Sequence, residues 1–144
     1  MKLTVDTSEL NQLTADLSSA PRNVWPNVFQ AVEVTARHIK DDWNEGLGGG
    51  KNTGSAFKHI GRSVDYDIGP MGGIVAAAAG VSRGVEADIG PNLARLQGSM
   101  AGWFEEGMRN IPALHPGHAA LKKNEQDFLN GLQKALADSL AESL

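Results

Sequence analysis

The pattern of apolar residues predicts a strong amphipathic helix in the first third of the chain. Pro26 suits such a helix only in its first turn, where its missing N–H costs no intrahelical hydrogen bond. We therefore expect a helix over about residues 23–45 that ends at Gly46. Its buried face is marked by apolar side chains at steps of three or four, namely Trp25, Val28, Phe29, Val32, Ala36, Ile39 and Trp43.

The segment before this helix predicts a short strand and a further helix. Leu3–Val5 can form the strand. Asp6 can then cap a helix with Glu9 three residues later, a variant of the capping box that satisfies free N–H groups. The apolar face of this helix is marked by Leu10, Leu13 and Leu17, and Pro21 either ends the helical run or restarts it.

From Ser63 onward the apolar period changes to two. Two segments alternate apolar and acidic side chains, which is typical of strands with one buried and one solvated face: Val64–Ile68 and Val85–Ile89. Between them, Ile74–Val81 is apolar and Ala-rich, and its composition fits a helix as well as a strand. The flanking Gly73 and Gly80 favour a strand in an antiparallel meander.

The last segment, Pro116–Leu144, predicts a long helix, with Pro116 near its start, where proline is favoured. Its expected apolar face consists of Leu121, Phe128, Leu132, Leu136 and Leu140. The elements together predict an α+β fold with two N-terminal helices, a small antiparallel sheet of about three to four strands, and a long C-terminal helix packed on the sheet.

Glycine is distributed unevenly along the chain. Of the 17 glycines, 15 lie between Gly46 and Gly107, and six of these fall within residues 46–62. At 144 residues, with 41% hydrophobic and 21% charged residues, the chain has the size and composition of one folded domain. We therefore expect a single domain over residues 1–144 with a flexible Gly-rich arm at about 46–62.

Charge and composition argue against several classes of protein. A formal net charge of -4 and a pI near 5.5 give no general attraction to nucleic acid. The absence of cysteine excludes disulfides and thiolate nucleophiles. Polar residues follow Met1 too early for a signal peptide, and no run approaches the roughly 20 apolar residues of a membrane span. We expect a protein made in the cytoplasm that has no membrane partner.

A Gly-rich motif at Gly48–Thr53 is similar to a phosphate-binding loop but departs from it. A phosphate-binding loop has a glycine five residues before the glycine of its Gly-Lys pair, but this chain has Glu45 there. The loop also has Ser or Thr directly after the lysine, but this chain has Asn52. It must also follow a strand and open a helix, whereas this segment follows a predicted helix. We expect no nucleotide site.

The remaining reactive side chains do not form a recognisable catalytic or metal-binding pattern. His115 and His118 lie close, but zinc would need two further ligands, and a surface turn with two solvated histidines is the better interpretation. Glu105 and Glu106 are adjacent, so their side chains diverge and do not form an acid–base pair. We expect no catalytic, cofactor-binding or metal-binding residues, and no enzyme.

One local charge feature departs from the acidic average. The stretch from Lys51 to Arg62 holds Lys51, Lys58, His59 and Arg62 and no acidic residue. It can meet an acidic neighbour or DNA, and a solvated loop explains it at least as well. The alternative function that follows is a small nucleic-acid-binding regulatory protein that uses residues 51–62.

The order of several short motifs resembles the head–tail joining, or tail-completion, proteins of long-tailed phages, the gene-product-ten-like family. The resemblance spans nearly the whole chain and ends with the C-terminal helix. The family often has Thr after the Glu-Gly pair and Pro-Phe in the turn, where this chain has Met108 and Leu114-His115. The matching motifs are Thr53-Gly54, Ile60-Gly61-Arg62-Ser63-Val64, Ile89-Gly90-Pro91, Trp103-Phe104-Glu105-Glu106-Gly107 and Ile111-Pro112-Ala113-Leu114-His115-Pro116.

This resemblance implies a structural virion protein of the phage neck, assembled in the host cytoplasm. The subunit is expected to form a ring with copies of itself, with sixfold symmetry. Its other partners are expected to be a head connector or stopper on one side and a tail terminator or tail tube protein on the other. DNA is expected only to pass through the lumen of the ring.

Two groups of residues are the candidates for subunit contacts. In the first, a neighbouring subunit would supply an apolar surface and a charge partner to the arm residues Phe57, Lys58, Ile60 and Arg62. The second group is the aromatic-acidic motif, formed by Trp103, Phe104, Glu105 and Glu106. Burial in the monomer core is an equally good interpretation of Trp103.

Overall fold

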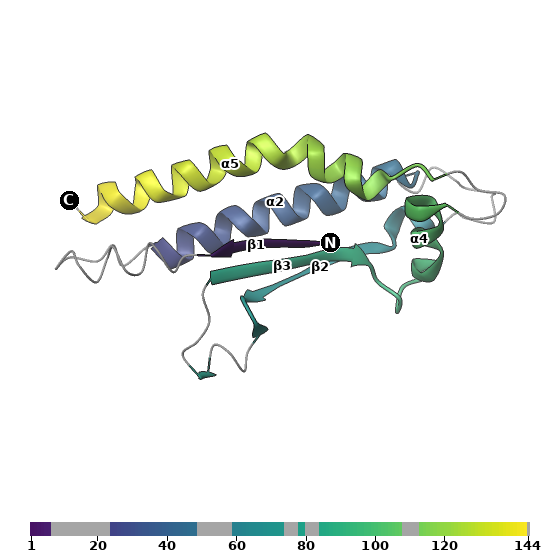
Figure 1. Cartoon of the computed structure of the whole chain (residues 1–144), viewed down its shortest axis with the longest axis horizontal. Coiled ribbons are helices and arrows are strands. Elements are labelled where there is room, and N and C mark those ends of the chain that lie inside the picture. The colour runs from purple at the N-terminus through teal and green to yellow at the C-terminus, as the bar shows by residue number, and fades with distance from the viewer. Residues whose placement is uncertain (7–23, 49–58, 74–77, 80–83, 108–112, 144) are drawn as a thin grey trace. The chain divides into compact units, whose positions relative to one another are not determined.

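The structure is a computed structural model, and it describes residues 1–6, 24–48, 59–73, 78–79, 84–107 and 113–143. The described part of the chain is α+β, as predicted (Figure 1). Its elements are β1 (Lys2–Asp6), α2 (Val24–Gly46), the 3-10 helix η1 (Ile60–Arg62), β2 (Val64–Pro70), β3 (Gly84–Pro91), α4 (Gly98–Glu106) and α5 (Pro116–Ser143).

Three strands form an antiparallel sheet in the order β1-β3-β2. The predicted strands at 64–68 and 85–89 are confirmed, and both observed strands end at the proline of an Asp-Ile-Gly-Pro sequence. The central strand is β3, which explains why Val85, Ala87 and Ile89 are all buried.

The predicted N-terminal strand at Leu3–Val5 is confirmed as β1, whereas the meander through residues 74–81 is not seen in the described residues. β1 pairs with β3, with Leu3 opposite Ala87 and Val5 opposite Val85. Residues 78–79 are not in a strand, and the rest of 74–81 lies outside the described residues. Among the described residues, β3 therefore has β1 on one side and β2 on the other.

The two long helices are confirmed almost to the residue, and Pro26 lies in the first turn of α2. Of the two predicted N-terminal helices, only α2 is among the described residues, because the other falls within 7–23. A third helix, α4, was not predicted. It follows Gln97, which has a left-handed backbone (φ 61°), and ends at Gly107, whose φ of 83° favours glycine.

The chain divides into two compact units. Unit 1 contains Met1, Ala36–Asp67 and Ile89–Glu125, and unit 2 contains Lys2–Thr35, Ile68–Asp88 and Gln126–Leu144. The elements α2, β2, β3 and α5 each contribute residues to both units, so neither unit is one continuous piece of sequence.

In unit 1, the C-terminal half of α2 packs closely on the start of α5. Trp43 is buried, and a Cβ atom added at Gly117 would lie 2.6 Å from its ring. Gly46 is also close to α5, since its added Cβ would lie 3.0 Å from Pro116 Cβ. The first turn of α5 therefore needs a residue without a side chain at position 117.

In unit 2, the N-terminal half of α2 lies beside the C-terminal half of α5 (Figure 1). A Cβ added at Gly131 would meet Ala31 Cβ at 4.0 Å, an ordinary contact distance. Asn27 Nδ2 donates a hydrogen bond of 2.9 Å to Ser139 Oγ, which itself donates to Ala135 O at 2.7 Å. Small residues thus bring the two helices together here as well.

The buried face of α5 differs from the predicted one. Its buried positions carry small or polar side chains, including Gly117, Ala120, Asn124, Ala135 and Ser139. The predicted apolar face is only half-buried at Leu121, Phe128, Leu132 and Leu136, and the side chain of Leu140 is outside the described part. The contacts above join α5 to α2, whereas the packing of α5 on the sheet stays a prediction.

Both ends of the expected arm at 46–62 belong to folded elements. Gly46 ends α2, and Leu47 is buried. At the other end, Ile60 is fully buried at the start of η1. Residues 49–58 lie outside the described residues.

We predict that Gly117→Ala destabilises the protein by about 1–3 kcal/mol, because the new methyl group overpacks the Trp43 ring. The matched control is Gly131→Ala in the same helix, where the methyl group has room and helix propensity favours alanine by about 1 kcal/mol. Urea unfolding followed by circular dichroism measures both. Equal stabilities for the two variants would contradict the close contact at Gly117.

Candidate functional site

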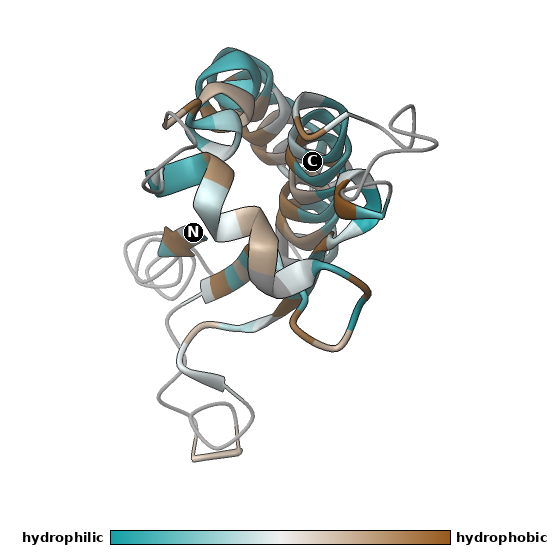
Figure 2. Cartoon of the chain, turned by 90° about the vertical axis from the view of Figure 1, so that its right-hand side faces the viewer, coloured by the Kyte–Doolittle hydropathy of each residue, from teal (hydrophilic) through white to brown (hydrophobic). Residues whose placement is uncertain are grey.

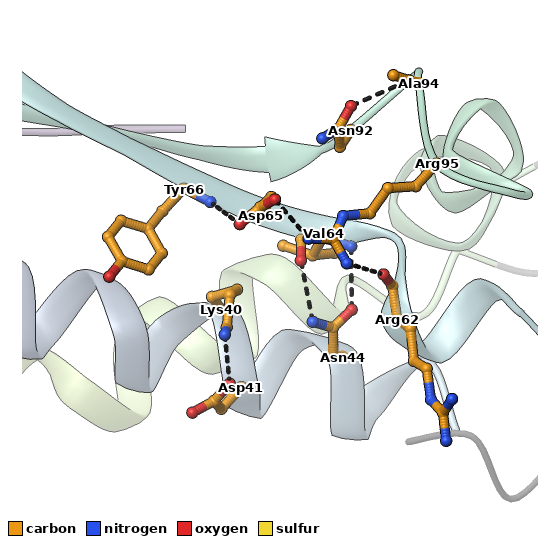
Figure 3. Close-up of polar contacts among 10 residues, drawn as sticks. All are labelled: Lys40, Asp41, Asn44, Arg62, Val64, Asp65, Tyr66, Asn92, Ala94 and Arg95. Carbon is orange, nitrogen blue, oxygen red and sulfur yellow. Dashed lines mark hydrogen bonds and ion pairs between the residues drawn. The ribbon is translucent and has the colours of Figure 1, made fainter.

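Unit 1 contains a cleft of about 480 Å³ between α2, η1, the start of β2 and the segment after β3 (Figure 3). Basic and acidic side chains face each other around it. Its lining residues are Lys40, Asp41, Asn44, Glu45, Gly61, Arg62, Val64 and Arg95.

Asn44 ties α2 to the first residue of β2. Its Nδ2 donates to Val64 O, and its Oδ1 accepts from Val64 N, both at 3.0 Å. The side-chain amide thus satisfies one donor and one acceptor of the strand, as a neighbouring strand does. Asn44 thus joins two walls of the cleft, α2 and the start of β2.

Arg95 bridges the segment after β3 to β2. Its NH2 lies 2.8 Å from Asp65 Oδ2, and its NH1 lies 3.4 Å from Arg62 O. Burial raises the pKa of Asp65, but hydrogen bonds from the Tyr66 N–H and the Arg95 guanidinium outweigh burial and hold that pKa below its usual value. Asp65 is therefore an ionised structural partner of Arg95.

Lys40 and Arg62 differ in how their charges are satisfied. Lys40 Nζ is 3.0 Å from Asp41 Oδ1 and 5.9 Å from the centroid of the Tyr66 ring, within the range of a cation–π interaction. The Arg62 guanidinium points away from Asp65 (Figure 3) and forms no ion pair with a described residue. Arg62 is thus the cation of the cleft that is best placed to meet another molecule.

A second polar cluster joins α2 to α5 in unit 1. Asp42 accepts from Lys123 Nζ at 2.8 Å and from Asn124 Nδ2 at 2.7 Å. Burial raises the pKa of Asp42, but these hydrogen bonds and the Lys123 charge outweigh burial and lower the pKa below its usual value. Asp42 thus stabilises the packing of α5 on α2 in its ionised form.

Glu105 of α4 caps the N-terminus of α5. Its Oε2 accepts from the Gly117 N–H at 2.7 Å, and its Oε1 accepts from the His118 N–H at 3.0 Å. A carboxylate at this end satisfies free N–H groups and interacts favourably with the helix dipole. The cap comes from a different helix, so the spacing of a local capping box does not reveal it in the sequence.

The predicted contact residues fall into different environments. Phe57 and Lys58 lie outside the described residues. Ile60 is fully buried within the chain, so it offers no surface to a neighbouring subunit, whereas Arg62 is exposed. The aromatic-acidic motif is split: Trp103 and Phe104 are half-buried, Glu105 is the α5 cap, and Glu106 is exposed.

His115 and His118, the closest pair of histidines in the sequence, are both exposed. Within the described residues, no group of three His, Asp or Glu side chains is arranged to hold a metal ion. None of the described helices is long and apolar enough to cross a membrane.

The sequence did not predict an exposed apolar loop between β3 and α4. This loop is formed by Asn92–Gln97 and is called the Leu93–Leu96 loop. Its leucines are strongly exposed, Leu93 at 77% and Leu96 at 69%. Figure 2 shows hydrophobic colour on its outward bend. A Gly-Pro pair at the end of a strand indicates a turn but does not indicate that the turn exposes leucines.

Hydrogen bonds anchor this loop at both ends. Asn92 N donates to Ser63 O at 2.7 Å, and Asn92 Oδ1 accepts from Ala94 N at 2.9 Å. At its other end, Gln97 Oε1 accepts from His59 N at 2.8 Å. The loop therefore presents its leucines on an ordered backbone.

Comparison of the chain with protein-family models, curated proteins and solved structures gives no match.

We predict that Glu105→Ala lowers stability by about 0.5–2 kcal/mol, the usual range for loss of a helix cap. The neighbouring Glu106→Ala removes an exposed carboxylate and should change stability by less than about 0.5 kcal/mol. Thermal and urea unfolding of the two variants provides the test. A larger loss for Glu106→Ala than for Glu105→Ala would show that the cap is misassigned.

We also predict that Asp42→Asn is less stable than the natural chain at pH 7 and that this difference disappears in acid. A carboxylate with a lowered pKa stabilises the fold above its unfolded pKa of about 3.9, and this stabilisation is lost as the pH falls through the folded pKa. Urea unfolding between pH 7 and pH 2 measures it, with the exposed Asp127→Asn as control. A difference that persists unchanged at the lowest pH would contradict the role of the charge.

Proposed function

We propose that this chain is a structural virion protein of the phage neck, a ring subunit that joins the head connector to the tail. Two features support the proposal: the order of motifs along the sequence and the Leu93–Leu96 loop. The loop lies between two of those motifs, Ile89–Pro91 and Trp103–Gly107. It is the observation that carries the proposal.

An ordered loop with exposed leucines is a surface suited to protein contact. Binding through a flexible loop costs about 1–2 kcal/mol for each backbone residue that becomes fixed, and an ordered loop avoids most of this cost. Leucine side chains gain free energy when a partner removes them from water. Such a surface suits permanent assembly with neighbouring subunits.

The hydrogen bonds and the ion pair around the cleft fit a subunit whose function depends on a fixed shape. Asn44, Arg95 and Asp65 hold separate elements together by direct contacts. In the proposed neck, the subunit would contact copies of itself, a connector or stopper, and a tail terminator or tail tube protein. Interfaces would hold these layers in position while DNA passes through the lumen.

Immunogold labelling of purified virions tests the proposal directly. With an epitope tag on this chain, we expect gold particles at the junction of head and tail. An untagged phage is the control for nonspecific label. Label confined to the capsid shell or tail fibres, or virions free of the chain, would overturn a neck function.

We predict that Glu106→Lys in the phage blocks head–tail joining and leaves the subunit folded, because Glu106 is exposed beside half-buried aromatic residues. Electron microscopy should then show separate heads and tails, while the purified variant melts as the natural chain does. Asp127→Lys, the same charge reversal at an exposed position of α5, is the control and should give normal particles. Infectious particles at normal yield from Glu106→Lys would contradict a contact at Glu106.

A further inference from the structure

The outer edge of β1 is a main-chain surface that a further strand can join. Among the described residues, β1 has β3 on one side and no strand on the other (Figure 1). The Ile89 N–H donates to Met1 O at 2.9 Å, so Met1 turns its main-chain groups to β3. Hydrogen-bonded pairs recur at every second residue of an antiparallel ladder, so Leu3 also faces β3. The main-chain groups of Lys2 and Thr4 therefore lie on the outer edge.

The other edge strand of the described sheet, β2, is less open to pairing. Asn44 occupies the main-chain N–H and C=O of Val64, and Pro70 has no N–H to donate. β1 contains no proline, and no described side chain forms a hydrogen bond with the outer main-chain groups of Thr4. Of the two edges in the described sheet, β1 is thus the one that another strand can join.

The apolar side chains of β1 are incompletely covered. Leu3 lies opposite Ala87 and Val5 lies opposite Val85, so they share the buried face of β3. Val85 and Ala87 are only 2% and 0% exposed, whereas Leu3 and Val5 are half-buried. A strand added beside β1 would place its own apolar side chains next to Leu3 and Val5 and remove them further from water.

The sequence of β1 is complementary to itself when two copies pair in opposite directions. With Thr4 opposite Thr4 of the second copy, Lys2 lies opposite Asp6. Leu3 then lies opposite Val5, so every cross-strand pair joins opposite charges, two threonines or two apolar side chains. Parallel pairing in the same register would instead place like charges opposite each other. Lys2 and Asp6 also interact within their own copy, so their charges select the direction of pairing while the main chain supplies the contact.

We infer that two copies of the chain pair through β1 in opposite directions, centred on Thr4, and join their sheets into one. The contact uses the same surface on both copies, so it is isologous and closes as a two-fold dimer. Five residues from each copy form a small interface, so the dimer is reversible. The inference goes beyond the proposed function, because a two-fold dimer of the free chain is distinct from the proposed ring.

Thr4→Pro tests the contact, because proline removes an N–H on the outer edge and leaves the hydrogen bonds between β1 and β3 in place. The matched control is Thr4→Ser, which keeps the N–H and a hydroxyl group. Sedimentation equilibrium over a range of concentrations measures the dissociation constant of the dimer. We expect the natural chain and Thr4→Ser to dimerise alike. Thr4→Pro should dimerise about tenfold or more weakly, because two main-chain hydrogen bonds are lost.

A Thr4→Cys variant tests the register, because the chain has no other cysteine. Opposite residues of a hydrogen-bonded antiparallel pair have Cα atoms about 5.5 Å apart, within reach of a disulfide. Under mild oxidation, we expect Thr4→Cys to form a covalent dimer about tenfold or more faster than Leu114→Cys, which changes an exposed leucine outside β1.

Circular dichroism melting verifies that the variants are folded, and the cysteine test decides if Thr4→Pro is not. Three results would each overturn the inference: a natural chain that stays monomeric at every concentration, a folded Thr4→Pro variant that dimerises as the natural chain does, or Thr4→Cys cross-linking at the rate of Leu114→Cys.

Discussion

The contact between Trp43 and Gly117 is the constraint on which unit 1 depends. The indole ring occupies the space where any other residue would place its Cβ, so α5 can begin only with glycine at this position. The same Gly117 donates its backbone N–H to Glu105, and the preceding Pro116 contacts the end of α2 at Gly46. One residue without a side chain thus joins three helices, and α4 is positioned because it supplies the cap.

The periodic elements could be predicted from the sequence, whereas the contacts between them could not. The stripe from Val28 to Trp43 defines α2, and the alternation in 85–89 defines β3, because side-chain spacing follows local backbone geometry. The buried face of α5 was misplaced because burial depends on the partner: α2 approaches the small residues Gly117 and Gly131, and the leucines remain half-buried. α4 was missed because its sequence holds two glycines and no clear apolar period.

The candidate contact residues were predicted with less success for the same reason. Glu105 and Glu106 are equivalent in sequence, but the fold uses one as a helix cap and leaves the other exposed. Ile60 and Arg62 are separated by one residue, yet η1 turns the first into the core and the second outward. Leu93 and Leu96 gave no periodic signal, and only the structure shows that both are strongly exposed.

The pairing of Asn44 with Val64 also bears on aggregation. β2 is an edge strand of the described sheet, and exposed edges can pair with strands of other molecules. Asn44 occupies the N–H and C=O of the first residue of this edge, while Asp65 and Asp67 add charge and Pro70 interrupts it. Association by the backbone is thereby discouraged at this edge. At this edge, contact between two copies of the chain then depends on side chains and not on strand pairing.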